Sequence, residues 1–143
     1  MRPTLFLADA AQAAGGKINA LGIGWENVSV GMAPWAIAGY IDVPWVESNR
    51  DHALIVELVT GDGAPVTVPT PLGDQPFRIE MGFQVGRPAG MAPGSSLRVP
   101  VVVALAPLPI SVGRYELRIR IDDTPFPEAT MMMQVVPQDQ SSR

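Results

Sequence analysis

The chain contains one histidine, His52, which would have to be the base of any Ser–His–Asp arrangement. Asp51 and Glu47 are close to it in sequence, and several serines could supply a nucleophile. However, the sequence has no Gly-x-Ser-x-Gly elbow, and His52 stands at the start of a predicted strand beside a charged loop. We therefore expect a half-exposed loop histidine, and we assign no catalytic residue.

Oxygen ligands for a metal ion could come from Asp122 and Asp123, which end a predicted strand, and from Glu128 in the following loop. Loop carboxylates at one end of a β-domain can bind Ca²⁺. Their spacing matches no recognised calcium-binding loop, and adjacent aspartates are equally typical of a solvated turn ahead of Pro125. We predict no cofactor and no metal. A Ca²⁺-type or hydrolytic site, if one exists, would use these three residues.

Four aromatic residues fall within one short stretch and could form a binding surface: Trp25, Trp35, Tyr40 and Trp45. Tryptophan serves both as a plug of a hydrophobic core and as an anchor at interfaces. We favour the interpretation that the tryptophans cap the ends of the core. The alternative is that the four side chains form a ligand or partner surface.

Length, charge and cysteine content limit the class of protein. The 143 residues have the length of one domain, which we assign to 1–137, followed by a disordered polar tail over 138–143. The chain has no cysteine, which excludes disulfides and thiolate metal sites. The net charge of −4 argues against a nucleic-acid partner.

The same composition bears on localisation. No run approaches the roughly 18 apolar residues that would cross a membrane. The apolar stretch near the N-terminus is short and is interrupted by Asp9, unlike a signal peptide. We therefore expect a cytoplasmic protein with no membrane contact.

Two segments alternate apolar and polar residues, 77–85 and 115–121, and each is typical of a strand with one buried face. Fifteen prolines and fourteen glycines divide the chain into short pieces, and no long amphipathic helix is predicted. We expect residues 10–16 to form a small-residue turn, with one helical turn over 10–14 as the alternative. The pattern predicts an all-β fold, a single antiparallel β-sandwich (Ig-like or jelly-roll-like) of about 7–9 strands.

Several outward positions of the predicted strands carry apolar side chains, namely Ile55, Val59, Val102 and Ala104. Apolar outward residues must be covered by a loop, by another element or by a second chain. A homo-oligomer contact at these positions and covering by the chain's own loops are equally compatible with the pattern.

Several short motifs follow one another in a characteristic order along most of the chain: Leu7-Ala8-Asp9-Ala10-Ala11-Gln12, Gly16-Lys17-Ile18-Asn19-Ala20-Leu21-Gly22, Trp25, Val43-Pro44-Trp45, Val68-Pro69-Thr70-Pro71, Val85-Gly86-Arg87-Pro88 and Gly113-Arg114-Tyr115. In this order the chain resembles a family of small, uncharacterised bacterial β-sandwich proteins, a domain of unknown function. The resemblance implies a compact domain in bacterial genomes. Because the family has no assigned activity, it implies no functional residues.

No nucleophile, base and oxyanion set is visible in the sequence, so we expect a non-enzymatic binding or assembly module. Its partner would be a second copy or another protein. One alternative is a metal-dependent or hydrolytic domain using the loop carboxylates. Another is a structural component of a phage or larger particle, where similar domains serve. Fold class alone does not choose among these functions.

Overall fold

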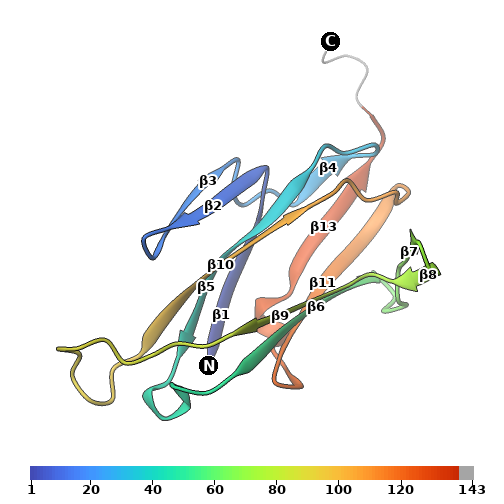
Figure 1. Ribbon diagram of the computed structural model, residues 1–143. Helices are drawn as coiled ribbons and strands as arrows, with labels where there is room; N and C mark the ends of the chain where they lie inside the picture. The colour runs from blue at the N-terminus through green and yellow to red at the C-terminus, as the bar shows by residue number, and fades with distance from the viewer. Residues whose placement is uncertain (139–143) are drawn as a thin grey trace.

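The structure, a computed structural model, describes residues 1–138 of the chain. Within this range the protein contains strands and two short 3₁₀ turns, η1 (Trp45–Glu47) and η2 (Pro127–Ala129), and no α-helix (Figure 1). No helix of these residues could cross a membrane. The all-β prediction is confirmed. The predicted tail falls mostly on 139–143, outside the described residues.

The described chain has thirteen strands, more than expected, because several are very short. They are β1 (Arg2–Ala8), β2 (Ala10–Ala14), β3 (Lys17–Leu21), β4 (Asn27–Ser29), β5 (Trp35–Val43), β6 (His52–Thr60), β7 (Thr67–Thr70), β8 (Gly73–Pro76), β9 (Arg78–Phe83), β10 (Leu97–Leu105), β11 (Gly113–Ile121), β12 (Thr124–Pro125) and β13 (Met131–Val136).

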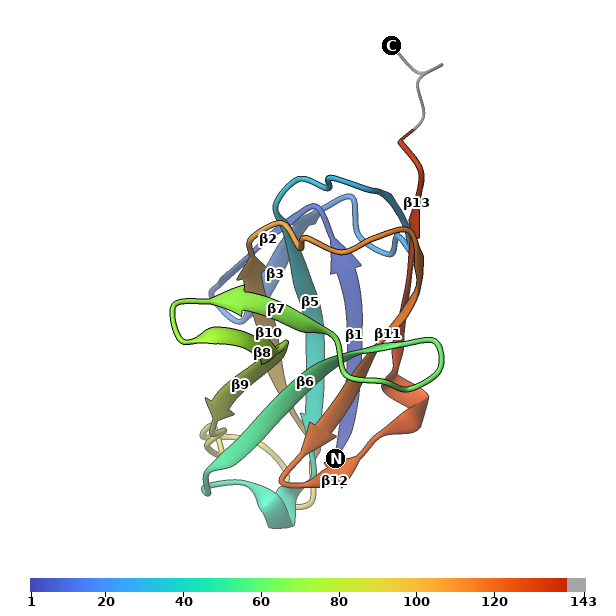
Figure 2. The ribbon, with the colours of Figure 1, turned by 90° about the vertical axis from the view of Figure 1, so that its right-hand side faces the viewer.

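These strands form four sheets (Figures 1 and 2). One has the order β1-β5-β10, and a larger one has the order β4-β13-β11-β6-β9 with β12 beside β11. The pairs β2–β3 and β7–β8 form two separate two-stranded sheets. All strand pairs are antiparallel except β4–β13, which is parallel. The all-β architecture is thus found, but the predicted single antiparallel sandwich is not confirmed, because one pairing is parallel and two hairpins form sheets of their own.

One hydrophobic core is shared by the two larger sheets. Its fully buried side chains come from β5, β10, β6, β11 and β13: Ile37, Ile41, Val43, Val101, Leu54, Val56, Leu58, Leu117, Ile119, Met133 and Val135. Along β6 and β11 these residues alternate with outward ones, as the period of two requires. Each such side chain contributes about 1.5–3 kcal/mol when it is fully buried.

The two alternating segments of the sequence become β9 and β11, but they are not neighbours. Strand β6 lies between them, and Glu57 of β6 is opposite Arg118 on one side and Arg78 on the other. Arg120 contacts Glu57 at 2.8 Å on the same outward face. Exposed ion pairs of this kind contribute little to stability. This face is a balanced, solvated surface.

Ile55 and Val59, two of the four candidate residues for a homo-oligomer contact, are buried within the chain, at 4% and 7% exposure. Ile55 is opposite Arg120 on β11 and Glu80 on β9, whose long side chains can cover it. Val59 is covered in part by a bridge to Pro65. The other two predicted contact residues, Val102 and Ala104 on β10, keep some exposure.

Residues 10–14 form strand β2 and not the turn that their small side chains suggested. The turn lies at Gly15 and Gly16, whose φ angles of 59° and 75° match a two-residue hairpin. The β2–β3 hairpin packs against β5 and β10. On β5 the alanines Ala36 and Ala38 alternate with the core residues and are nevertheless buried. Strand β5 is therefore covered on both faces.

Gly39, in the middle of β5, allows β1 to approach closely. A Cβ atom at this position would lie 1.9 Å from the carbonyl oxygen of Thr4 and 2.8 Å from Leu5 Cα, both backbone atoms. We expect Gly39→Ala to lower the free energy of unfolding by about 3 kcal/mol or more, since backbone cannot move aside cheaply. Urea unfolding measures the effect.

Gly82→Ala on β9 is the matched control, because the nearest atom to its added Cβ, His52 O, lies at 3.8 Å. Its unfolding midpoint should stay close to that of the wild type or rise slightly. Equal midpoints for the two variants would contradict the close approach at Gly39.

Candidate functional site

The four predicted aromatic residues do not form one surface. Trp35 begins β5, is buried, and donates its indole N–H to Ala106 O at 3.0 Å, with Trp25 packed edge-on at 6.2 Å. Tyr40 lies on the outward face of β5 beneath the Arg98 guanidinium. Trp45 follows the other end of β5, in η1. Nine residues of strand separate the two ends, so a joint surface is excluded.

The three predicted metal-ligating carboxylates are also dispersed. Asp122 is engaged by His52, while Asp123 is exposed and lies 3.9 Å from Arg120. Glu128 belongs to η2, the 3₁₀ turn before β13. Within residues 1–138 no three His, Cys, Asp or Glu side chains are placed to hold a metal ion.

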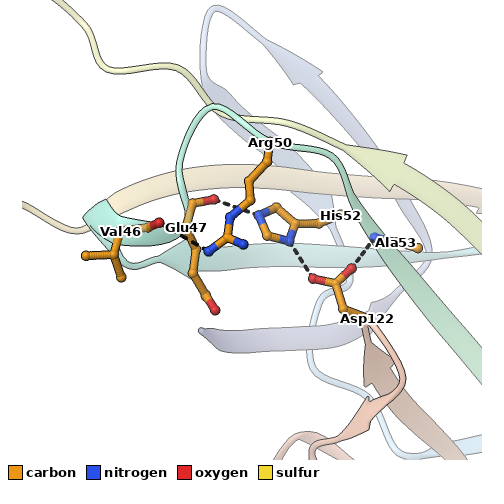
Figure 3. A network of polar contacts seen from close by, with 6 residues as sticks. All are labelled: Val46, Glu47, Arg50, His52, Ala53 and Asp122. Atoms are coloured by element: carbon orange, nitrogen blue, oxygen red, sulfur yellow. Dashed lines mark hydrogen bonds and ion pairs between the residues drawn. The ribbon is translucent and has the colours of Figure 1, made fainter.

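A polar network instead surrounds the only histidine (Figure 3). His52 Nδ1 lies 2.5 Å from Asp122 Oδ2, and His52 Nε2 lies 2.7 Å from the carbonyl oxygen of Glu47. The second oxygen of Asp122 accepts a hydrogen bond from Ala53 N at 2.9 Å, and Asp122 N donates to Ala53 O at 3.0 Å. The network joins the start of β6 to the turn after β11 and to η1.

The expectation of a half-exposed loop histidine is wrong. The His52 side chain is 4% exposed and stacks on Phe83, with ring centroids 5.3 Å apart. A signal for this burial was present in the sequence, because His52 shares the inward parity of Leu54 and Val56 on the same strand. The pairing with Asp122, 70 positions away, has no local sequence signal.

Local backbone geometry places the Asp122 carboxylate. Asp122 and Asp123 both adopt positive φ, 51° and 65°, and form the two-residue turn between β11 and β12. Aspartate tolerates this conformation better than most side chains, and such turns suit antiparallel hairpins. The adjacent aspartates therefore build a turn, and one of them also serves as the partner of His52.

Both partners of the His52 ring are hydrogen-bond acceptors, so both ring nitrogens must donate, which requires the charged imidazolium. Burial lowers the pKa of His52, but the hydrogen bonds and charges of Asp122 and Glu47 outweigh it and raise the pKa above its ordinary value. Burial raises the pKa of Asp122, but the bonds from His52 and Ala53, with the charges of His52 and Arg50, lower it overall.

This geometry does not supply a general base, because an imidazolium has no free lone pair. Nor does the ring activate Ser48, which follows η1. Ser48 Oγ donates to Trp45 O at 2.6 Å and accepts from Arg87 Nε at 2.6 Å, so it is bonded away from the ring. In this arrangement His52 ties the start of β6 to η1 and to the turn after β11.

Trp45 is half-buried and is partly covered by the chain itself. The Arg87 guanidinium lies over its ring at 4.5 Å, and Arg87 Nη2 donates to Trp45 O at 2.8 Å. These contacts tie the loop after β9 to η1. A cation–π contact of this kind contributes about 0.5–1 kcal/mol at exposed sites. Arg87 therefore covers part of the Trp45 ring, and the side chain as a whole is half-buried.

A different feature has the form of a binding site. A cavity of ≈ 320 Å³ lies between β1 and the start of β13, two strands that lie side by side in Figure 2. Two continuous five-residue runs line it, 3–7 and 128–132, and residues 24–26 complete the wall. Because consecutive residues line it, and not alternate ones, the walls are backbone edges more than side-chain faces. We call this cavity the slot.

The slot exists because two strand edges are unpaired there. Leu7 O accepts from Gly24 N at 2.7 Å, on the side of β1 away from β5, and Glu26 O accepts from Gln134 N at 2.7 Å beside β13. Alternation along each strand then directs the N–H and C=O of Leu5 and Met132 into the slot. Within the described residues β1 pairs only with β5, and β4 reaches β13 only from Gln134 onward.

Beside the slot lie two exposed apolar side chains and one buried hydrogen-bond donor without an acceptor. Phe6 is 46% exposed and Met132 is 37% exposed. The indole nitrogen of Trp25 is buried and has no hydrogen-bond partner, the single such side-chain atom among residues 1–138. An unsatisfied buried donor costs about 1–3 kcal/mol. Of the four predicted aromatics, Trp25 is the one that lines the slot.

Comparison with known families gives a match over most of the fold. A family model described as a family of unknown function (DUF6941) covers residues 3–134, so the chain belongs to this family. The resemblance inferred from the motifs, to a domain of unknown function, is confirmed. A search of curated proteins found no match. The matched range includes both walls of the slot and the His52–Asp122 pair.

The charged pair predicts a pH dependence of stability. Because the pKa of His52 is raised in the folded protein, its protonation stabilises the fold fully below about pH 6.5, the ordinary pKa of histidine. This stabilisation is lost as the pH rises through the raised pKa. Because the pKa of Asp122 is lowered in the folded protein, its ionisation stabilises the fold fully above about pH 3.9, the ordinary pKa of aspartate. This stabilisation is lost as the pH falls through the lowered pKa. Asp122→Asn should therefore cost most between these limits, about 1–3 kcal/mol, and less on either side.

Asp123→Asn is the control, since Asp123 has the same backbone conformation and an exposed side chain. Urea unfolding from pH 3 to 9 should give a bell-shaped difference from wild type for Asp122→Asn and a flat one for Asp123→Asn. A penalty at position 122 that does not vary with pH would contradict the charged pair.

Proposed function

We propose that this domain is a non-enzymatic binding or assembly module and that its partner occupies the slot between β1 and β13. The observation that carries the proposal is the pair of unpaired strand edges facing one cavity. The exposed apolar side chains of Phe6 and Met132 beside it support the same conclusion. Large exposed apolar groups around a concavity are a feature of interaction sites.

We infer a polypeptide partner in preference to a nucleic acid. Glu26 and Glu128 line the slot, no lysine or arginine does, and the chain has a net charge of −4. Phosphate backbones are bound by clustered positive charge. Backbone edges, in contrast, are complementary to another polypeptide backbone.

We also infer that the two larger sheets act as the two faces of a sandwich whose open side is the slot. Their shared core supports this description. The hydrolytic and metal-dependent alternative has less support, because His52 is fully hydrogen-bonded and the loop carboxylates are apart. A role as a component of a larger particle would require contacts between copies, which the same experiment detects.

A displayed library of random heptapeptides, selected on the immobilised protein, tests the proposal. Wild type should enrich a set of sequences, and Phe6→Glu should weaken their binding at least tenfold because it places a charge beside the slot. Leu72→Glu is the matched control, since Leu72 is also an exposed apolar residue but lies between β7 and β8.

Three outcomes would overturn the proposal. One is the absence of any sequence that binds wild type above background. A second is equal binding to wild type and Phe6→Glu. The third is regular self-assembly by light scattering that persists in Phe6→Glu, which would favour the particle component.

A further inference from the structure

We propose that the slot accepts an extended polypeptide segment of a partner protein, which adds a strand to the free edge of β1 and carries a basic side chain toward Glu26 and Glu128. This inference rests on the proposed function, because it specifies the occupant of the same slot.

The free edge of β1 sets the length and register of the added strand. Pro3 has no N–H, so the first donor that faces the slot is that of Leu5. The carbonyl of Leu7 is already bonded to Gly24 N, which closes the other end. Between these limits the Pro3 carbonyl, both Leu5 groups and the Leu7 N–H face outward. An extended segment of about four or five residues would match this edge.

The charges of the slot select the partner. Glu26 and Glu128 lie on its walls, and the ion pairs of the described chain use other carboxylates. No basic side chain lines the cavity to balance them. A lysine or arginine on the incoming strand would supply this balance, whereas an acidic one would be repelled.

The same charges disfavour a second copy of the chain as the occupant. Symmetric pairing of β1 with β1 of another copy would bring the glutamates of both slots toward one another. Pro3 also removes a donor from the edge, a common way in which edge strands avoid such pairing. The observations therefore favour a different, basic segment.

Side chains of the slot would gain from such a strand. Residues of an added strand alternate, so one set would lie beside the exposed ring of Phe6 and the other toward the core side of β1, next to Leu5 and Leu7. Peptide carbonyls entering the slot would also bring acceptors to the wall that contains Trp25, whose indole N–H lacks one.

The heptapeptide library selected on wild-type protein provides the probe. The pool that depends on Phe6 should be enriched in lysine and arginine and depleted of aspartate and glutamate. Selection on the double variant Glu26→Gln, Glu128→Gln should lose this bias, because the opposing charges are gone. Both side chains are exposed and, within the described residues, neither carboxylate accepts a hydrogen bond, so the variant should fold normally.

The peptide that binds most tightly is then synthesised in two forms. One form carries N-methyl groups on its odd-numbered amides and the other on its even-numbered amides. N-methylation removes a donor and blocks the strand edge, and only every second N–H of an added strand faces β1. One set should weaken binding at least tenfold by calorimetry, and the other less than threefold. In ¹⁵N–¹H spectra the Trp25 indole signal should shift on binding, and that of Trp35 should not.

The outcomes separate the two proposals. If peptides bind in a Phe6-dependent way but without basic bias, or if both N-methylated sets bind equally, strand addition by a basic segment is wrong and the binding function stands. If no peptide depends on Phe6, the proposed function fails as well. A dimer of the free protein that Phe6→Glu dissociates in sedimentation would assign the slot to a second copy and overturn the inference.

Discussion

The His52 ring, hydrogen-bonded at both of its nitrogens, makes the contacts on which one end of the fold depends. The chain passes there from the smaller sheet, at the end of β5, to the larger sheet, at the start of β6. Asp122 and the Glu47 carbonyl hold the ring from two different segments, and Ala53 holds Asp122 from a third direction. Because a charged ring with both nitrogens satisfied has only one good orientation, the crossing has a defined geometry.

That crossing and the burial of β5 together explain why the slot is open. Strand β5 pairs with β1 on one side and β10 on the other, and Gly39 allows β1 to lie close to it. The position of β1 is thus fixed by β5 and not by any strand on its far side. On the larger sheet β4 joins β13 only near its end. Two edges remain that the chain does not pair with each other.

The sequence predicted what depends on local pattern. Alternation in 77–85 and 115–121 identified β9 and β11. The alanine-rich β2 was missed because small residues carry no strand signal, and its identity depends on its hairpin with β3. Ile55 and Val59 were expected outside because parity does not tell which side chains of the neighbouring strands will cover them.

The candidate site was less accessible to sequence reasoning than the fold. Trp25 was singled out, but Phe6, Met132 and Glu26 were not, since nothing in their own segments marks them. A slot between two edges is defined by pairings that do not form, and these depend on the register of β4 against β13. The pairing of His52 with Asp122 likewise joins residues 70 positions apart.

The slot is bordered by the first and the last strands of the described fold. A force that separates these two strands would open the protein along the slot, because β1 and β13 are not paired with each other there. A segment bound between them would add hydrogen bonds that must break before the two strands separate. An occupant of the slot would therefore act as a mechanical clasp as well as a ligand.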